Sequence, residues 1–163
     1  LKQAPGTPVT SFCSGDGTAT PCPCGNTGAA GNGCANSVNA AGANLAGTGN
    51  ASIAVDTFLL QGSGMPNSSA LYFQGTAMQG GGGGAVFGDG LRCAGGSVAR
   101  LGTKQNAAGA SQYPAAGDPS VSVRGQCAAG DFRTYQVWYR NAASFCVAAT
   151  FNLSNGVSVT WVP

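Results

Sequence analysis

Residues 132 to 140 follow a period of two in which one side is entirely apolar from Tyr135 to Tyr139. The segment is rich in aromatic and β-branched residues and contains no Gly or Pro, which is typical of a central strand. Successive side chains of a strand point to opposite faces, so one face carries Tyr135, Val137 and Tyr139, and the other carries Gln136, Trp138 and Arg140. Neither face is typical of solvent exposure. We therefore expect this strand to form the centre of the core, with Trp138 covered by a neighbouring loop.

Other segments with the same period predict further strands at residues 51–61, 69–76, 97–104, 121–124, 148–153 and 157–162. Turn residues at 62–67 join the first two of these into a predicted hairpin. Asn155 and Gly156 join the last two into another, because this dipeptide favours tight hairpin turns. Only residues 35–46, which are rich in Ala, are expected to form a short helix.

The spacing of these segments predicts an all-β protein, a β-sandwich or jelly roll of about nine or ten strands stapled by disulfides. A chain of 163 residues is long enough for one domain with a buried core. We expect an extended arm at residues 1–12 and a single domain at residues 13–163. Within that domain, residues 13–34 are a loop-rich cysteine segment with little apolar bulk.

Charged residues make up only 7% of the chain, compared with about 25% in an average soluble domain. The net charge is +2, and the seven Lys and Arg residues are scattered along the sequence, which argues against a nucleic-acid partner. No run of about 18 apolar residues occurs, so no membrane insertion is expected. The chain begins with Leu1, and we expect it to be either a mature protein or part of a longer one.

Seven cysteines indicate an oxidising compartment and therefore a secreted, extracellular or cell-surface protein. Cys22 and Cys24 flank a single proline and are badly placed to bond each other. Of the three pairings open to the first four cysteines, we favour Cys13–Cys24 with Cys22–Cys34, and we pair Cys93 with Cys146 across the sheets. Cys127 is then left over, either as an inert buried thiol or as a bond to another chain.

The chain contains no histidine and no glutamate, which removes most catalytic arrangements. Four of its five aspartates lie in turns next to Gly, where Asp is a common turn residue. The catalytic alternative is that two of the five aspartates meet as a carboxylate pair. We therefore expect no enzymatic activity. Zinc is disfavoured by the lack of ligands, and we expect no cofactor, although calcium remains a weak alternative through Asp16, Asn26 and Asn32.

Two further sets of residues are candidates for modification or ligand binding. Asn50, Asn67 and Asn152 begin Asn-x-Ser sequences and are candidate glycosylation sites. Sandwich folds often display aromatic side chains to carbohydrates, and the candidates here are Tyr72, Tyr113, Trp138 and Trp161.

Several strings in the chain are specific, notably Cys-Pro-Cys-Gly-Asn at 22–26, Phe-Gly-Asp-Gly-Leu-Arg-Cys at 87–93 and Tyr-Gln-Val-Trp-Tyr-Arg-Asn at 135–141. With these strings the chain resembles a disulfide-rich module, often C-terminal, of uncharacterised secreted proteins from environmental bacteria. The resemblance covers nearly the whole chain from Phe12 onward. It implies export and a β-fold but no reaction, and Cys127 departs from its six-cysteine pattern.

Together these features predict a non-catalytic extracellular structural module, a subunit of a fibre or cell-surface assembly. Its partners would be copies of itself, joined by exchange of the N-terminal arm as an added strand. The low charge content favours large neutral surfaces that suit such packing. The alternative is a carbohydrate-binding or adhesion module.

Overall fold

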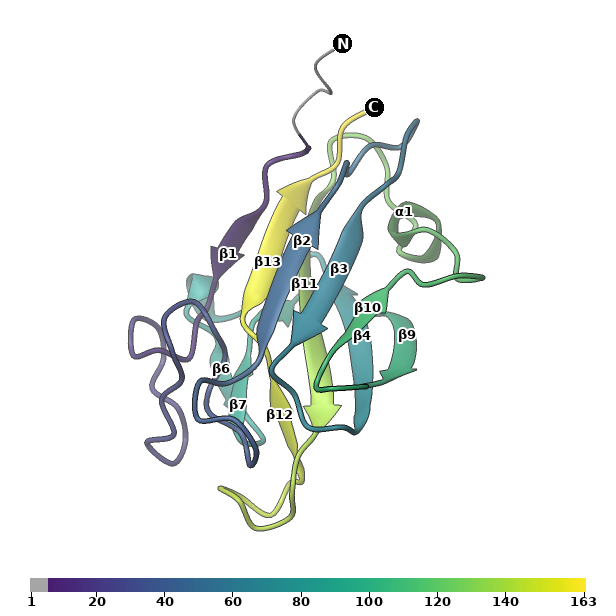
Figure 1. Ribbon diagram of the computed structural model, residues 1–163. Coiled ribbons are helices and arrows are strands. Elements are labelled where there is room, and N and C mark those ends of the chain that lie inside the picture. The colour runs from purple at the N-terminus through teal and green to yellow at the C-terminus, as the bar shows by residue number, and fades with distance from the viewer. Residues whose placement is uncertain (1–5) are drawn as a thin grey trace.

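A computed structural model describes residues 6–163, so the first five residues of the expected arm, including Lys2, lie outside the described residues. The described chain is an all-β sandwich in which a larger and a smaller antiparallel sheet face each other (Figure 1). The larger sheet has the order β1-β13-β11-β4-β9, with β12 also paired to β11. Its strands are β1 (Thr10–Phe12), β4 (Ser69–Gly75), β9 (Ala99–Gln105), β11 (Phe132–Arg140), β12 (Phe151–Leu153) and β13 (Gly156–Thr160).

The smaller sheet has the order β10-β3-β2, and β2 and β3 lie in front of the larger sheet in Figure 1. Its strands are β2 (Asn44–Thr48), β3 (Leu59–Ser63) and β10 (Ser111–Tyr113). Two short ribbons pair β5 (Ala77–Met78) with β8 (Ala94–Gly95) and β6 (Ala85–Phe87) with β7 (Gly90–Arg92). Helical structure is limited to a 3-10 turn at Gln79–Gly82 and to α1 (Val121–Arg124) within residues 6–163.

The predicted central strand is confirmed as β11, which covers the expected residues 132–140. It pairs with β4 along one edge and with β13 and β12 along the other. Tyr135, Val137 and Tyr139 are fully buried between the two sheets, where Phe58 and Leu60 pack in the same core. The period-two alternation therefore identified both the strand and its core face.

The opposite face of β11 is covered near its middle by the chain that joins β7 to β8. The Gln136 side chain accepts a hydrogen bond from the Cys93 N–H at 2.8 Å and donates to the carbonyls of Leu91 and Ser154 at 2.8 and 2.6 Å. This amide is fully buried, and its bonds provide the donors and acceptors that a buried polar group needs. Trp138, two residues further on, is only partly covered.

Both predicted hairpins are wrong. β3 and β4 belong to different sheets, because the turn at 62–67 carries the chain across the sandwich. β12 and β13 pair with successive parts of the same edge of β11 and not with each other. Asn155 is fully buried, and its side chain bonds the N–H and carbonyl of Leu45 in β2. The dipeptide thus links two sheets, because its amide satisfies the backbone of a strand from the opposite layer.

Three other local expectations also differ from the structure. Residues 35–46 form turns and the start of β2, where the Asn36 and Asn39 side chains bond nearby backbone groups in place of a helix. Residues 121–124 form helix α1 and not a strand, and the Asp56 carboxylate accepts a hydrogen bond from the Ser122 N–H at 2.8 Å. Of the strand expected at 51–61, only the last residues enter β3.

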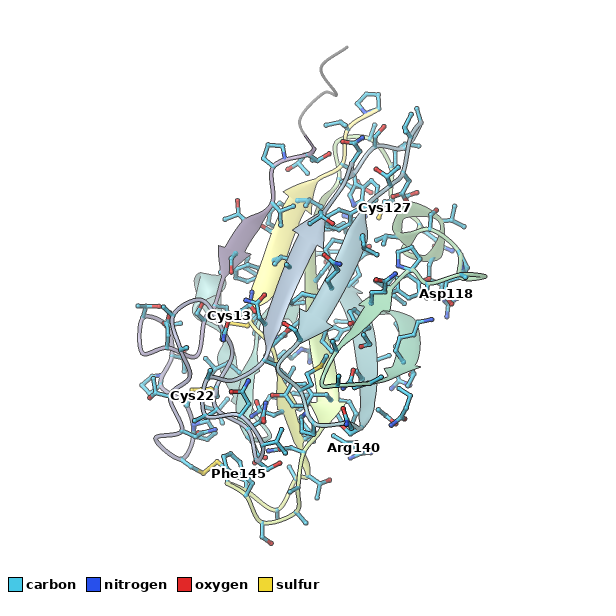
Figure 2. All side chains as sticks on the ribbon, in the orientation of Figure 1. Cys13, Cys22, Asp118, Cys127, Arg140 and Phe145 are labelled. Atoms are coloured by element: carbon cyan, nitrogen blue, oxygen red, sulfur yellow. A yellow bond between two sulfur atoms is a disulfide. The ribbon has the colours of Figure 1, made fainter. Side chains whose placement is uncertain are left out.

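Three disulfides join the six cysteines that were expected to be bridged. Cys22–Cys34 forms as predicted, but the other bonds are Cys13–Cys93 and Cys24–Cys146, which join residues 80 and 122 positions apart. The prediction joined Cys13 to Cys24 because they are close in sequence. In the structure, Cys13 follows β1 and meets Cys93, which follows β7, while Cys24 meets Cys146 in the loop after β11. The cysteine segment, in which Figure 2 labels Cys13 and Cys22, is therefore tied to the sandwich by two long-range bonds.

The three disulfides indicate an oxidising environment for the folded chain. Across residues 6–163, no helix has the length and apolar character required to cross a membrane.

Candidate functional site

A groove of about 550 Å³ lies on the outer face of the larger sheet. Strands β4, β9 and β11 form its floor, and the β6-β7 ribbon and β12 form a wall. The residues that line it are Ser69, Leu71, Phe73, Phe87, Arg92, Val98, Arg100, Thr103, Trp138, Arg140 and Phe151. The lining combines aromatic and aliphatic side chains with hydroxyl groups and arginines, a mixture typical of ligand sites.

The register of the sheet places Leu71 of β4 in the middle of this floor and Trp138 of β11 at the side next to β12. Trp138 is opposite Leu71, and Leu71 is opposite Thr103, so one row crosses all three strands. Arg140 follows Trp138 on the same face of β11, because the two are separated by one residue. Alternation along one strand and pairing across the sheet together bring these side chains into one site.

A β-bulge turns Arg100 towards the groove. The register of β4 and β9 shifts between Tyr72 and Phe73, so that Phe73 pairs with Arg100 and Leu101 is the extra residue. Leu101 is buried in the core, whereas Arg100 is exposed and lines the groove with Thr103, three positions away. In a regular strand, residues three apart would face opposite sides, so the bulge is the feature that adds this arginine to the site.

Three aromatic rings form one side of the groove. The centroids of Trp138 and Phe151 are 5.1 Å apart with an angle of 33° between the rings, and those of Phe151 and Phe87 are 4.8 Å apart at 57°. The guanidinium carbon of Arg140 lies 4.6 Å from the Trp138 centroid, which is within the range of a cation–π contact. Phe87 is 40% exposed, so the cluster is open to a ligand at its outer end.

The charge of the groove is positive. Arg92, Arg100 and Arg140 line it, and no aspartate does. Within residues 6–163 the ion pairs are Lys104–Asp118 and Arg133–Asp131, so all three groove arginines lie outside them. Two of the three are oriented by single hydrogen bonds, from Arg92 Nε to the Ala94 carbonyl at 3.2 Å and from Arg140 Nη1 to Thr150 Oγ1 at 3.3 Å.

Of the four aromatic residues predicted to bind a ligand, only Trp138 lines the groove. Tyr72, Tyr113 and Trp161 are at most 1% exposed in the core, so they are not available as a binding platform. Their polar atoms bond inside the protein, as in the 3.0 Å bond from Trp161 Nε1 to the Tyr135 hydroxyl. Phe87, Phe151 and the three arginines were not predicted as ligand-binding residues. The sequence signalled only Arg140, which lies on the same face of the predicted strand as Trp138.

The weak calcium candidates all have protein partners. The Thr18 hydroxyl and the Gly31 N–H donate to the Asp16 carboxylate and hold its pKa below the usual range. The Asn26 amide donates to the carbonyls of Ala35 and Asp89, and the Asn32 oxygen accepts from the Asn44 amide. Within residues 6–163, no three His, Cys, Asp or Glu side chains lie close enough together to hold a metal ion.

The remaining aspartates also serve the fold. The Asp89 carboxylate is fully buried and accepts hydrogen bonds from the Asn141 amide and the Val147 N–H. Asp56, Asp118 and Asp131 each accept a backbone N–H in a turn or at α1.

The three candidate glycosylation sites differ in accessibility. Asn67 is exposed and Asn50 is partly exposed, both in loops. Asn152 is fully buried in β12, and its amide donates to the Ala35 carbonyl at 3.0 Å, so a glycan has no room there in the folded protein.

Cys127 is the free cysteine among residues 6–163. Its thiol is half-buried and donates to Gln74 Oε1 at 3.2 Å, and burial raises its pKa. Cys127 and Arg140 lie towards opposite ends of the molecule, so this thiol is remote from the Arg140 end of the groove (Figure 2).

Comparison of the chain with protein-family models, with curated proteins and with solved structures found no match. The resemblance to a disulfide-rich secreted module therefore stays a prediction. The groove and its side chains are the features from which a function is proposed.

Proposed function

We propose that this protein is a non-catalytic extracellular binding module whose groove holds a carbohydrate chain. The observation that supports this function best is the aromatic cluster of Trp138, Phe151 and Phe87, which lies beside hydroxyl groups in a concave surface. The apolar faces of sugar rings pack on aromatic side chains, while their hydroxyl groups need polar partners. Ser69 and Thr103 provide such partners on the same floor.

The scaffold suits binding without movement. Most of the groove residues lie on paired strands, and side chains on strands are positioned more rigidly than side chains on loops. Three disulfides reinforce the same domain, which supports the proposed extracellular location. The proposed binding needs no cofactor, because the aromatic rings, hydroxyls and arginines provide all the contacts.

Two exposed phenylalanines allow a matched test of this function. Phe87 in the groove and Phe132 at the start of β11, outside it, are both 40% exposed. We expect Phe87→Ala to weaken binding of a soluble polysaccharide about tenfold, the loss typical of one aromatic contact, and Phe132→Ala to leave it unchanged. Affinity electrophoresis against a panel of neutral and acidic polysaccharides measures this. Equal effects of both substitutions, or no retardation by any polysaccharide, would reject the groove as a carbohydrate site.

A second candidate function, assembly into a fibre or surface layer, is supported by the position of β1. This strand has three residues and lies at the edge of the larger sheet, where β13 is its one partner among the strands of residues 6–163. A short edge strand that precedes the rest of the domain can be replaced by the same strand from another copy. The partner in this case is a second copy of the chain.

A further inference from the structure

Positive charge is concentrated in the groove although the molecule as a whole is almost neutral. Six Lys and Arg residues lie within residues 6–163, and three of them line this one site. The net charge of the whole chain is only +2. Since like charges repel, gathering three arginines in one groove without an aspartate disfavours the unliganded state, and a negatively charged ligand relieves that repulsion.

Arg140 is already oriented for an anion. Its guanidinium lies over the Trp138 ring and donates one hydrogen bond, from Nη1 to Thr150 Oγ1. A guanidinium has five N–H donors in a planar fork that matches a carboxylate, so donors of Arg140 beyond the one used remain for a ligand. The contact with Trp138 reduces the side-chain freedom that would otherwise be lost on binding.

We infer that the groove selects acidic polysaccharides, and specifically chains of uronic acid units whose carboxylates bind its three arginines. This inference rests on the proposed carbohydrate function and narrows its ligand class. The aromatic wall and Leu71 contact the apolar faces of the sugar rings, while Arg92, Arg100 and Arg140 bind carboxylates carried by the chain. A neutral polysaccharide contacts the aromatic wall and Leu71 but leaves the three arginines without a carboxylate partner.

A polyuronate fits the charges better than a nucleic acid does. Strong binding to a nucleic acid depends on many phosphate contacts along a continuous basic surface. Here two of the cations outside the groove, Lys104 and Arg133, are already in ion pairs with Asp118 and Asp131. Arg124 is the one other Lys or Arg of residues 6–163 that is in neither ion pair, so the positive charge is concentrated in the groove, which matches a few sugar units of a polymer.

A matched pair of polymers tests the selection. Polygalacturonate and its fully methyl-esterified form have the same sugar units, and only the first carries carboxylates. We expect the full-length protein to bind polygalacturonate at least tenfold more tightly in isothermal titration calorimetry, and we expect this preference to weaken at high salt. If both forms bind equally, charge selection is wrong although the carbohydrate function stands. If neither form binds but a neutral polysaccharide does, the selection of acidic polysaccharides is again wrong and the carbohydrate function again stands.

Arginine variants locate the interaction. We expect Arg100→Gln and Arg140→Gln each to weaken polygalacturonate binding about tenfold, because each removes a charge-assisted contact. Arg140→Lys keeps the charge but loses the fork, and we expect it to bind more weakly than the wild type. Arg124→Gln replaces an exposed arginine of α1 that lies outside the groove and whose Nε donates to the Leu101 carbonyl at 3.2 Å. This variant removes the same charge, and at an unchanged unfolding temperature it should bind as the wild type does.

Three results would overturn the inference. Equal losses for Arg124→Gln and the groove variants would show general attraction to the protein surface. Binding of a single-stranded DNA oligonucleotide as tight as that of polygalacturonate would show a general preference for polyanions. Unchanged binding by Arg100→Gln and Arg140→Gln, with unfolding temperatures equal to the wild type, would place the carboxylates elsewhere.

Discussion

At the scale of the residue, position relative to the sheet decides what each side chain contributes. Arg100 is a groove residue because Leu101 occupies the bulge, and Trp138 is one because β11 alternates. The same rule places Tyr72 and Trp161 in the core, where aromatic side chains stabilise the sandwich and do not meet a ligand. Residue type alone does not distinguish these two roles.

Cys127 provides a prediction at this scale. Its thiol is half-buried, and its pKa is raised above the ordinary value because burial disfavours the charged thiolate. The raised pKa leaves less of the reactive thiolate at neutral pH. We expect iodoacetamide to modify Cys127 at least tenfold more slowly in the folded protein than in denaturant without reductant, with the rate rising towards higher pH. Mass spectrometry measures the rate of modification. Equal rates in the folded and the denatured protein would favour a thiol that is available to another chain.

At the scale of the element, buried side-chain amides join strands that do not pair with each other. Asn155, directly before β13, bonds the N–H and carbonyl of Leu45 in β2, a strand of the other sheet. Gln136 does the same between β11 and the chain around Cys93. These amides stabilise the contact between separate strands, because they satisfy backbone groups that would otherwise be buried without partners.

Replacement of Asn155 tests this role. We expect Asn155→Ala to lower the free energy of unfolding by about 2–3 kcal/mol, because it leaves the buried N–H and carbonyl of Leu45 without partners. Denaturant unfolding monitored by tryptophan fluorescence measures the loss. Asn50→Ala is the control, since Asn50 is partly exposed in a loop, and its effect should stay below about 0.5 kcal/mol. A similar small effect of Asn155→Ala would contradict the role of this amide.

At the scale of the whole molecule, long-range covalent bonds combine a loop-rich segment with a sandwich. Cys13–Cys93 and Cys24–Cys146 close segments of 80 and 122 residues, and disulfides that close long segments restrict the unfolded chain most. They let residues 13–34 keep a defined position although this segment has little apolar bulk. The edge strand β1 directly precedes the first of these bonds.

Assembly through the arm is tested at this scale. If copies exchange β1, deletion of residues 1–11 should give folded monomers, because it removes two of the three residues that pair with β13. Deletion of residues 1–5 retains β1 and is the matched control, which should assemble as the full chain does. Electron microscopy and light scattering report the outcome. Filaments of the longer truncation, or no filaments of the full chain, would reject arm exchange and leave the groove as the basis of function.

The sequence alone determined the fold class, the central strand with its core face, and the oxidising environment. Each of these follows from local information: alternation with a period of two in β11, a high content of turn residues, and the number of cysteines. The Cys22–Cys34 bond was also predictable, because its loop spans only 12 residues.

The tertiary structure alone decided which distant segments meet. Asn155 and Gly156 have the chemistry of a hairpin turn, yet burial against β2 stabilises a different conformation. The disulfides of Cys13 and Cys24 and the three arginines of the groove likewise depend on strand order and on one bulge. The physical reason is that alternation specifies which way a side chain points from its own strand, whereas the packing of the whole chain selects the neighbour that it meets.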